Sequence, residues 1–125
     1  MFPDLRGQVV ERIMFDYSAT LVLSSAAEVR IEQAFLLEDA DKSVGLGPIS
    51  PEAPEGSGRV LGVLHQQVVA AEVDGLGQLR MRFGNGLVLT CAPSEAFEAW
   101  SLTLVDGELF VCQPGGGIAH WAATA

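Results

Sequence analysis

The chain has 125 residues, 49% of them hydrophobic and 18% charged, and this composition excludes a disordered chain of low hydrophobicity. Its formal net charge of -9 at pH 7 excludes the clustered basic surface that nucleic-acid binding normally requires. The length suits one domain over residues 1–125. Neither a signal sequence nor an apolar run of membrane-spanning length is present, so we expect a cytoplasmic protein without membrane association.

The first predicted strands lie within residues 5–38 and alternate polar with apolar side chains. Residues 28–32 read Glu-Val-Arg-Ile-Glu, and a period of two is typical of a half-buried strand. The turn at residues 24–26 is predicted to be a three-residue hairpin loop. That loop length puts the following apolar side chains on one face of the hairpin: Leu21, Leu23, Val29 and Ile31.

Residues 39–58 are predicted to form a loop, because they include three prolines and four glycines. After the loop, Ser57 is predicted to cap a short helix that runs to about Gln66. Its apolar stripe is Val60, Leu61, Val63 and Leu64. We expect at most one helix in the chain.

Residues 64–105 resemble residues 5–38 when the chain is compared with itself at an offset of about 60. Gln8-Val9-Val10 matches Gln67-Val68-Val69, and Leu21 and Leu23 match Met81 and Phe83. A three-residue loop at Gly84-Asn85-Gly86 keeps the apolar residues of this half on one face, whereas a two-residue Asn-Gly loop mixes the faces. We therefore predict a mainly β fold of two similar antiparallel β-meander repeats, packed as a sandwich or barrel. Chance similarity between two meanders is the alternative.

The C-terminal part, residues 100–122, is predicted to form a hairpin and a final strand. Its turn is Asp106-Gly107, and a last strand over Ile118–Ala122 follows the glycine run.

The spacing of the candidate ligands matches neither a metal-binding nor a cofactor-binding motif. His65 and His120 lack a second ligand at zinc-binding spacing. Residues 39–43 resemble the start of a calcium loop, but Val44 and Ser50 occupy the positions that require Gly and Glu. We expect no metal site and no cofactor.

Catalytic groups are equally scarce. Cys91 and Cys112 lie in apolar strand-like runs, which favours buried free thiols, with a disulfide as the alternative. Glu95 and Glu98 form a carboxylate pair, but acidic residues abound in this chain and the pair is weak evidence for acid–base work. Residues 114–117, Pro-Gly-Gly-Gly, lack the Lys-Ser/Thr of a P-loop. We expect no enzymatic activity.

Several segments together resemble a family of small actinobacterial domains of unknown function. The most specific are Glu-Ala-Trp at residues 98–100 and Pro-Gly-Gly-Gly-Ile-Ala-x-Trp at residues 114–121. The chain departs from the family pattern at residues 65–67 and 24–27, where turns with glycine are usual. The resemblance covers nearly the whole chain and implies no activity.

Two functional hypotheses follow. The first is a noncatalytic interaction module that forms a homodimer or binds a basic protein partner, as in the immunity-protein class. The second is a small-ligand pocket between the two repeats, lined by Tyr17, Trp100 and Trp121. Aromatic and polar residues at strand ends are the candidate site: Asp16, Tyr17, Trp100 and Trp121.

Overall fold

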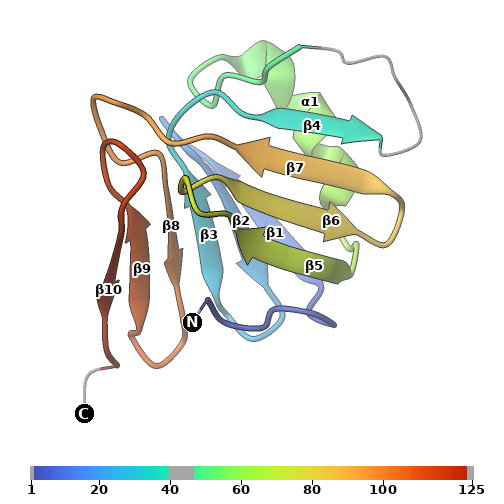
Figure 1. The fold of residues 1–125 in the computed structure, drawn as a ribbon. Helices are drawn as coiled ribbons and strands as arrows, with labels where there is room; N and C mark the ends of the chain where they lie inside the picture. The colour runs from blue at the N-terminus through green and yellow to red at the C-terminus, as the bar shows by residue number, and fades with distance from the viewer. Residues whose placement is uncertain (1, 40–46, 124–125) are drawn as a thin grey trace.

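The computed structural model describes residues 2–39 and 47–123, and it contains two antiparallel β-sheets and a short helical segment (Figure 1). The strands are β1 (Val10–Phe15), β2 (Ala19–Leu23), β3 (Glu28–Ile31), β4 (Leu36–Asp39), β5 (Val68–Val73), β6 (Leu79–Phe83), β7 (Leu87–Cys91), β8 (Trp100–Thr103), β9 (Leu109–Cys112) and β10 (Ile118–Trp121). The mainly β prediction is confirmed.

The two sheets exchange strands between the halves of the sequence. The larger sheet has the order β1-β2-β3-β8-β9-β10, and the smaller has the order β4-β7-β6-β5. Each predicted meander therefore keeps three of its strands together, while its fourth strand joins the other sheet: β4 pairs with β7, and β8 pairs with β3. The predicted meanders thus account for the first three strands of each half, and the exchange of the fourth strands was not predicted. The chain crosses to the facing sheet in the short loop between β3 and β4 and again in the longer loop between β7 and β8.

The hairpin registers follow the predicted parity. Leu21 lies opposite Val29 in the β2–β3 pair, and Met81 lies opposite Leu89 in the β6–β7 pair. Both connections are three-residue loops, at residues 24–26 and 84–86. Burial of the apolar face fixes these registers, because a shift by one residue would turn every core side chain toward solvent.

The first hairpin of each half has the same bulged construction. β1 is bulged after Val10, which lies opposite Leu23, and β5 is bulged after Val68, which lies opposite Phe83. An isolated antiparallel bridge joins Val9 to Gln67 just before these two strands. Val10 and Val68 thus occupy corresponding places 58 residues apart, so the sequence match of Val10 with Val69 is one residue out. The origin of the two halves by duplication stays a prediction.

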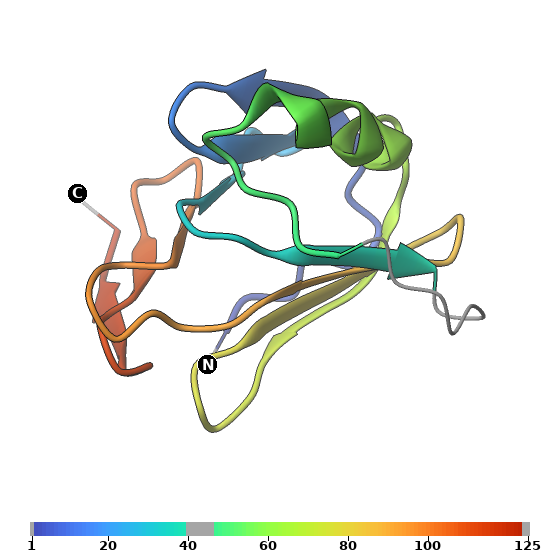
Figure 2. The same cartoon turned by 90° about the horizontal axis from the view of Figure 1, so that it is seen from above.

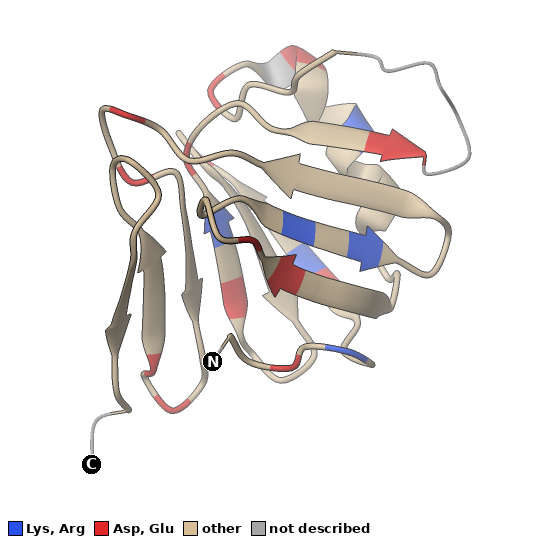
Figure 3. Cartoon of the chain, viewed as in Figure 1, with Lys and Arg blue, Asp and Glu red and all other residues tan. Residues whose placement is uncertain are grey.

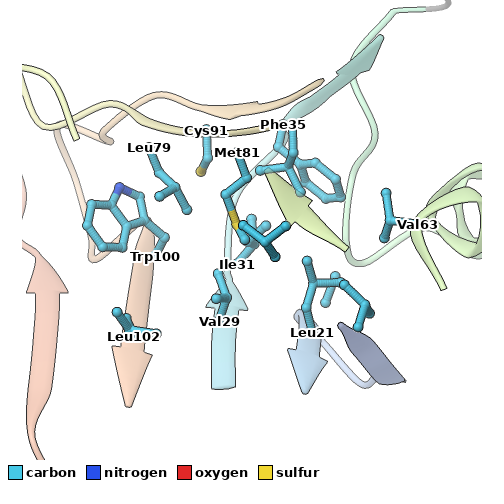
Figure 4. Close-up of a cluster of buried hydrophobic side chains, with 14 of the residues drawn as sticks. Leu21, Val29, Ile31, Phe35, Val63, Leu79, Met81, Cys91, Trp100 and Leu102 are labelled. Carbon is cyan, nitrogen blue, oxygen red and sulfur yellow. The ribbon is translucent and has the colours of Figure 1, made fainter. Parts of the chain in front are cut away.

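The core lies between the two sheets. Figure 4 shows side chains from both sheets pointing toward one another, among them Leu21, Ile31, Met81 and Trp100. Trp100 is the largest fully buried side chain, and its indole Nε1 donates to the carbonyl oxygen of Gly77 at 3.0 Å. Burial of so much apolar surface is the main stabilising contribution to the fold.

The helical segment begins and ends earlier than predicted. It consists of η1 (Pro54–Gly56), α1 (Ser57–Val60) and η2 (Leu61–Val63), and it packs beside the sheets through the buried Val60 and Val63 (Figure 2). Gly56, not Ser57, is the N-cap residue, and no side chain caps the helix. Leu64 is extended, which ends the helical segment before the predicted Gln66. Within the predicted loop, Ile49 is buried and forms a bridge with Phe35.

The glycine run before β10 has a packing role. A Cβ atom added to Gly116 would overlap the carbonyl oxygen of Leu76, and one added to Gly77 would overlap Gly116. The β9–β10 turn therefore touches the β5–β6 turn backbone to backbone, which only glycine permits.

Candidate functional site

The candidate site is an acidic cleft at the loop end of the larger sheet. It is an open depression of about 590 Å³, and its lining residues come from five separate segments of the chain. They are Tyr17, Glu32, Glu52, Phe97, Glu98 and Pro114. We call this site the acidic cleft.

Tyr17 is held at the tip of the β1–β2 turn by its two neighbours. The Ser18 backbone N–H and hydroxyl both donate to Oδ1 of Asp16, at 2.8 and 2.6 Å. These bonds, with a smaller contribution from Arg30, lower the pKa of Asp16. The closed turn leaves the Tyr17 side chain 85% exposed, so its ring is free to contact a partner.

Phe97 and Glu98 are placed by a turn that Ser94 stabilises. The Ser94 hydroxyl oxygen accepts from the backbone N–H of Ala96 at 3.0 Å and of Phe97 at 3.3 Å. The carbonyl oxygen of Ser94 accepts from the Gly115 N–H at 2.8 Å, which ties this loop to the turn containing Pro114. The Phe97 ring remains about half exposed as a result.

The charge of the acidic cleft is only partly compensated. Arg30 lies 3.8 Å from Glu32 and the same distance from Asp16, a spacing typical of weak surface ion pairs. Among the described residues, no ion pair involves Glu52 or Glu98. Two unpaired carboxylates beside two exposed aromatic rings form a surface suited to an organic cation.

The described parts of the chain contain no three His, Cys, Asp or Glu side chains grouped so that they could hold a metal ion. The first residues of the calcium-like sequence include Asp39, but its continuation at residues 40–43 and Val44 lies outside the described residues.

The four residues predicted as a site are not brought together. Tyr17 lines the acidic cleft, and Asp16 is the acceptor that closes the turn beside it. Trp100 is fully buried with its N–H bonded, so it belongs to the core. Trp121 is half exposed on β10, the edge of the sheet opposite β1. A pocket between the two halves lined by Tyr17, Trp100 and Trp121 does not form in this arrangement.

The sequence prediction missed four members of the cleft lining outright: Glu32, Glu52, Phe97 and Pro114. Glu98 drew attention as half of a carboxylate pair with Glu95 and as part of the Glu-Ala-Trp segment, but not as a site residue. The one available signal was the exposed apolar residue Phe97 between acidic residues, since a large apolar side chain in a polar loop often marks a binding surface.

The two cysteines are buried and free. Burial raises the pKa of the Cys91 thiol to about 12, with a smaller contribution from Cys112, and burial also raises the pKa of Cys112. Thiols with raised pKa are poor nucleophiles at neutral pH.

A second, smaller depression of about 190 Å³ is lined mainly by apolar side chains. Its residues are Phe2, Val73, Asp74, Phe110 and Ile118. It is smaller than the roughly 300–1,000 Å³ of typical ligand pockets.

No helix in the described residues is both long and apolar enough to pass through a membrane. Comparison with known proteins finds no significant match among curated proteins and none among solved structures. One protein family, described as a family of unknown function, matches residues 1–122. The chain therefore belongs to this family, DUF6188.

Proposed function

We propose that the chain is a noncatalytic binding module whose acidic cleft takes a basic side chain of a protein partner. The observation that carries the proposal is the lining of the cleft, where Glu52 and Glu98 stand beside the exposed rings of Tyr17 and Phe97. A cation over an aromatic face is stabilised by about 0.5–2 kcal/mol, and Arg side chains make this contact most often.

The overall charge supports a basic partner. The net charge of -9 produces a negative field that accelerates the approach of a positively charged protein. Figure 3 shows the positions of acidic residues distributed over both sheets and their loops, with fewer basic residues between them. The overall negative field raises the association rate, whereas the cleft binds one side chain of the partner.

The test is a calorimetric titration of the whole protein with a capped oligo-arginine peptide. Replacing Glu52 and Glu98 by Gln is expected to weaken binding about tenfold or more, because both charges face the bound cation. The matched control replaces Glu11 and Glu95 by Gln, which removes the same total charge from exposed positions outside the cleft lining. Equal weakening by both pairs would show that only net charge matters and would overturn the proposal.

The aromatic contribution is tested separately at Tyr17. Because its side chain is 85% exposed, Tyr17→Ala leaves the core intact and removes only the ring. Binding of the same peptide should weaken severalfold, while Leu76→Ala, at another exposed apolar position, should leave it unchanged.

A further inference from the structure

The β10 edge of the larger sheet differs from the other three sheet edges. β1 carries a bulge and the charged Glu11 and Arg12, and β5 carries a bulge and Glu72. β4 ends in Glu38 and Asp39. Bulges and charges are the usual means by which proteins prevent an edge strand from pairing with another chain. β10, with the sequence Ile-Ala-His-Trp, has neither.

The backbone of β10 presents unpaired groups on its outer side. The Gln113 N–H donates to the carbonyl oxygen of Gly117, and hydrogen-bonded pairs alternate along an antiparallel ladder. In the β9–β10 register, the next hydrogen-bonded pairs after Gln113 and Gly117 are Val111 with Ala119 and Leu109 with Trp121. The backbone groups of Ala119 and Trp121 therefore point toward β9. The N–H and C=O groups of Ile118 and His120 consequently point away from the sheet.

β10 itself and the residues that follow it carry no formal charge, although the Glu108 carboxylate lies 3.1 Å from the His120 ring nitrogen Nε2. Residues 109–125 contain no Asp, Glu, Lys or Arg, and this is the longest such run in a chain with 16 acidic residues. The ribbon of β10 carries no Lys, Arg, Asp or Glu colour in Figure 3. Two molecules that each carry a charge of -9 repel one another, so a contact between them is least costly where few charges are present, and the His120 ring shares a hydrogen bond with the one carboxylate beside β10, Glu108.

We infer that β10 is a dimerisation edge, at which a second copy of this chain adds its own β10 in antiparallel orientation. An antiparallel strand edge complements itself about a two-fold axis, so the outward groups of Ile118 in one copy meet those of His120 in the other. Ile118 and Trp121 are both exposed large apolar residues, and they lie on opposite faces of β10. Pairing therefore covers apolar surface on both sides of the joined sheet. This edge is separate from the acidic cleft.

The test is the self-association of the whole protein, measured by sedimentation equilibrium over a range of concentrations. Ile118→Pro removes one outward N–H without removing a bond to β9, and proline is tolerated on such an edge. Ile118→Ala is the matched control, because it also loses the side chain but keeps the N–H. We expect a dimer whose dissociation constant rises about tenfold or more in Ile118→Pro relative to Ile118→Ala.

A second pair of variants guards against misfolding of the proline variant. Trp121→Glu places a negative charge on β10 in each copy and should dissociate the dimer, whereas Leu76→Glu adds the same charge at an exposed position outside β10 and should not. A wild-type protein that stays monomeric at all concentrations would overturn the inference. So would a dimer whose affinity is unchanged by both Ile118→Pro and Trp121→Glu.

Discussion

The turn between β2 and β3 holds an alanine in a conformation that suits glycine. Ala26 has φ of 73°, and its N–H donates to the Leu23 carbonyl at 2.8 Å. Gly86 takes the corresponding place in the β6–β7 turn, with φ of 91° and a bond from its N–H to Phe83 of 3.0 Å. Replacing Ala26 by Gly should therefore relieve backbone strain and keep the hydrogen bond.

The expected gain is the difference of two opposing effects. The left-handed conformation costs an L-residue roughly 1–2 kcal/mol. Glycine, in turn, makes the unfolded chain more flexible, which costs about 0.4–1 kcal/mol. The Ala26 side chain is exposed, so little packing is lost on its removal. Ala26→Gly should raise the free energy of unfolding by about 0.5–1 kcal/mol.

Urea unfolding followed by tryptophan fluorescence measures this change. Gly86→Ala is the reverse experiment and should destabilise by a similar amount, since a Cβ there meets nothing closer than Asp39 Oδ1 at 3.8 Å and only the backbone is strained. Ala96→Gly, at an exposed position without positive φ, should destabilise the protein. If Ala26→Gly lowers stability as much as Ala96→Gly does, the reasoning from backbone strain is refuted.

Four further predictions concern stability and thiol chemistry. His65, exposed with φ of 67°, should also stabilise the protein by about 0.5–1 kcal/mol when replaced by Gly, measured by the same urea unfolding. Trp100→Phe removes the indole donor to the Gly77 carbonyl, leaves that oxygen the weaker Cys112 thiol at 3.4 Å, and should cost about 1–3 kcal/mol in urea unfolding. A change near zero would contradict a structural role for the indole bond. Cys91 should resist iodoacetamide in the native protein at pH 8 and react after unfolding. Folding raises the pKa of Cys91 from 9.0 to about 12, so the native state holds this proton more tightly than the unfolded state does. The resulting contribution to the free energy of unfolding is complete below pH 9 and is lost as the pH rises toward 12. Thermal unfolding across that pH range measures the loss.

Local features of the fold could be predicted from the sequence because they depend on neighbouring residues. Alternation of side chains and burial of one face were enough to give the three-residue loops at residues 24–26 and 84–86. The exchange of β4 and β8 could not be predicted in this way, because partner choice at a sheet edge depends on contacts between segments far apart in the chain. The bulges in β1 and β5 could not be predicted for the same reason, and because of them Val10 corresponds structurally to Val68 rather than to Val69.

The candidate site shows the limit more strongly. Trp100 attracted attention as an aromatic residue near a strand end, yet aromatic residues are equally suited to a core, and only the position of the facing sheet decides between the two. Tyr17 was predicted on the same grounds and is exposed, because it lies in a closed turn beyond the last strand pair. Glu52 lines the cleft from the predicted loop over residues 39–58, and no local sequence pattern indicates this placement.

The acidic cleft and the β10 edge can be tested independently, and their combination makes one more prediction. A dimer joined at β10 carries two clefts, so a surface densely coated with oligo-arginine should hold it more tightly than free peptide does, through a raised effective concentration. Ile118→Pro should abolish that advantage on the surface while leaving the affinity of each cleft for free peptide unchanged, because Ile118 does not line the cleft. The double variant Glu52→Gln and Glu98→Gln should weaken the binding of free peptide at each cleft and leave the dimer intact. If Ile118→Pro weakens the binding of free peptide as well, the two surfaces are coupled and their separate assignment is refuted.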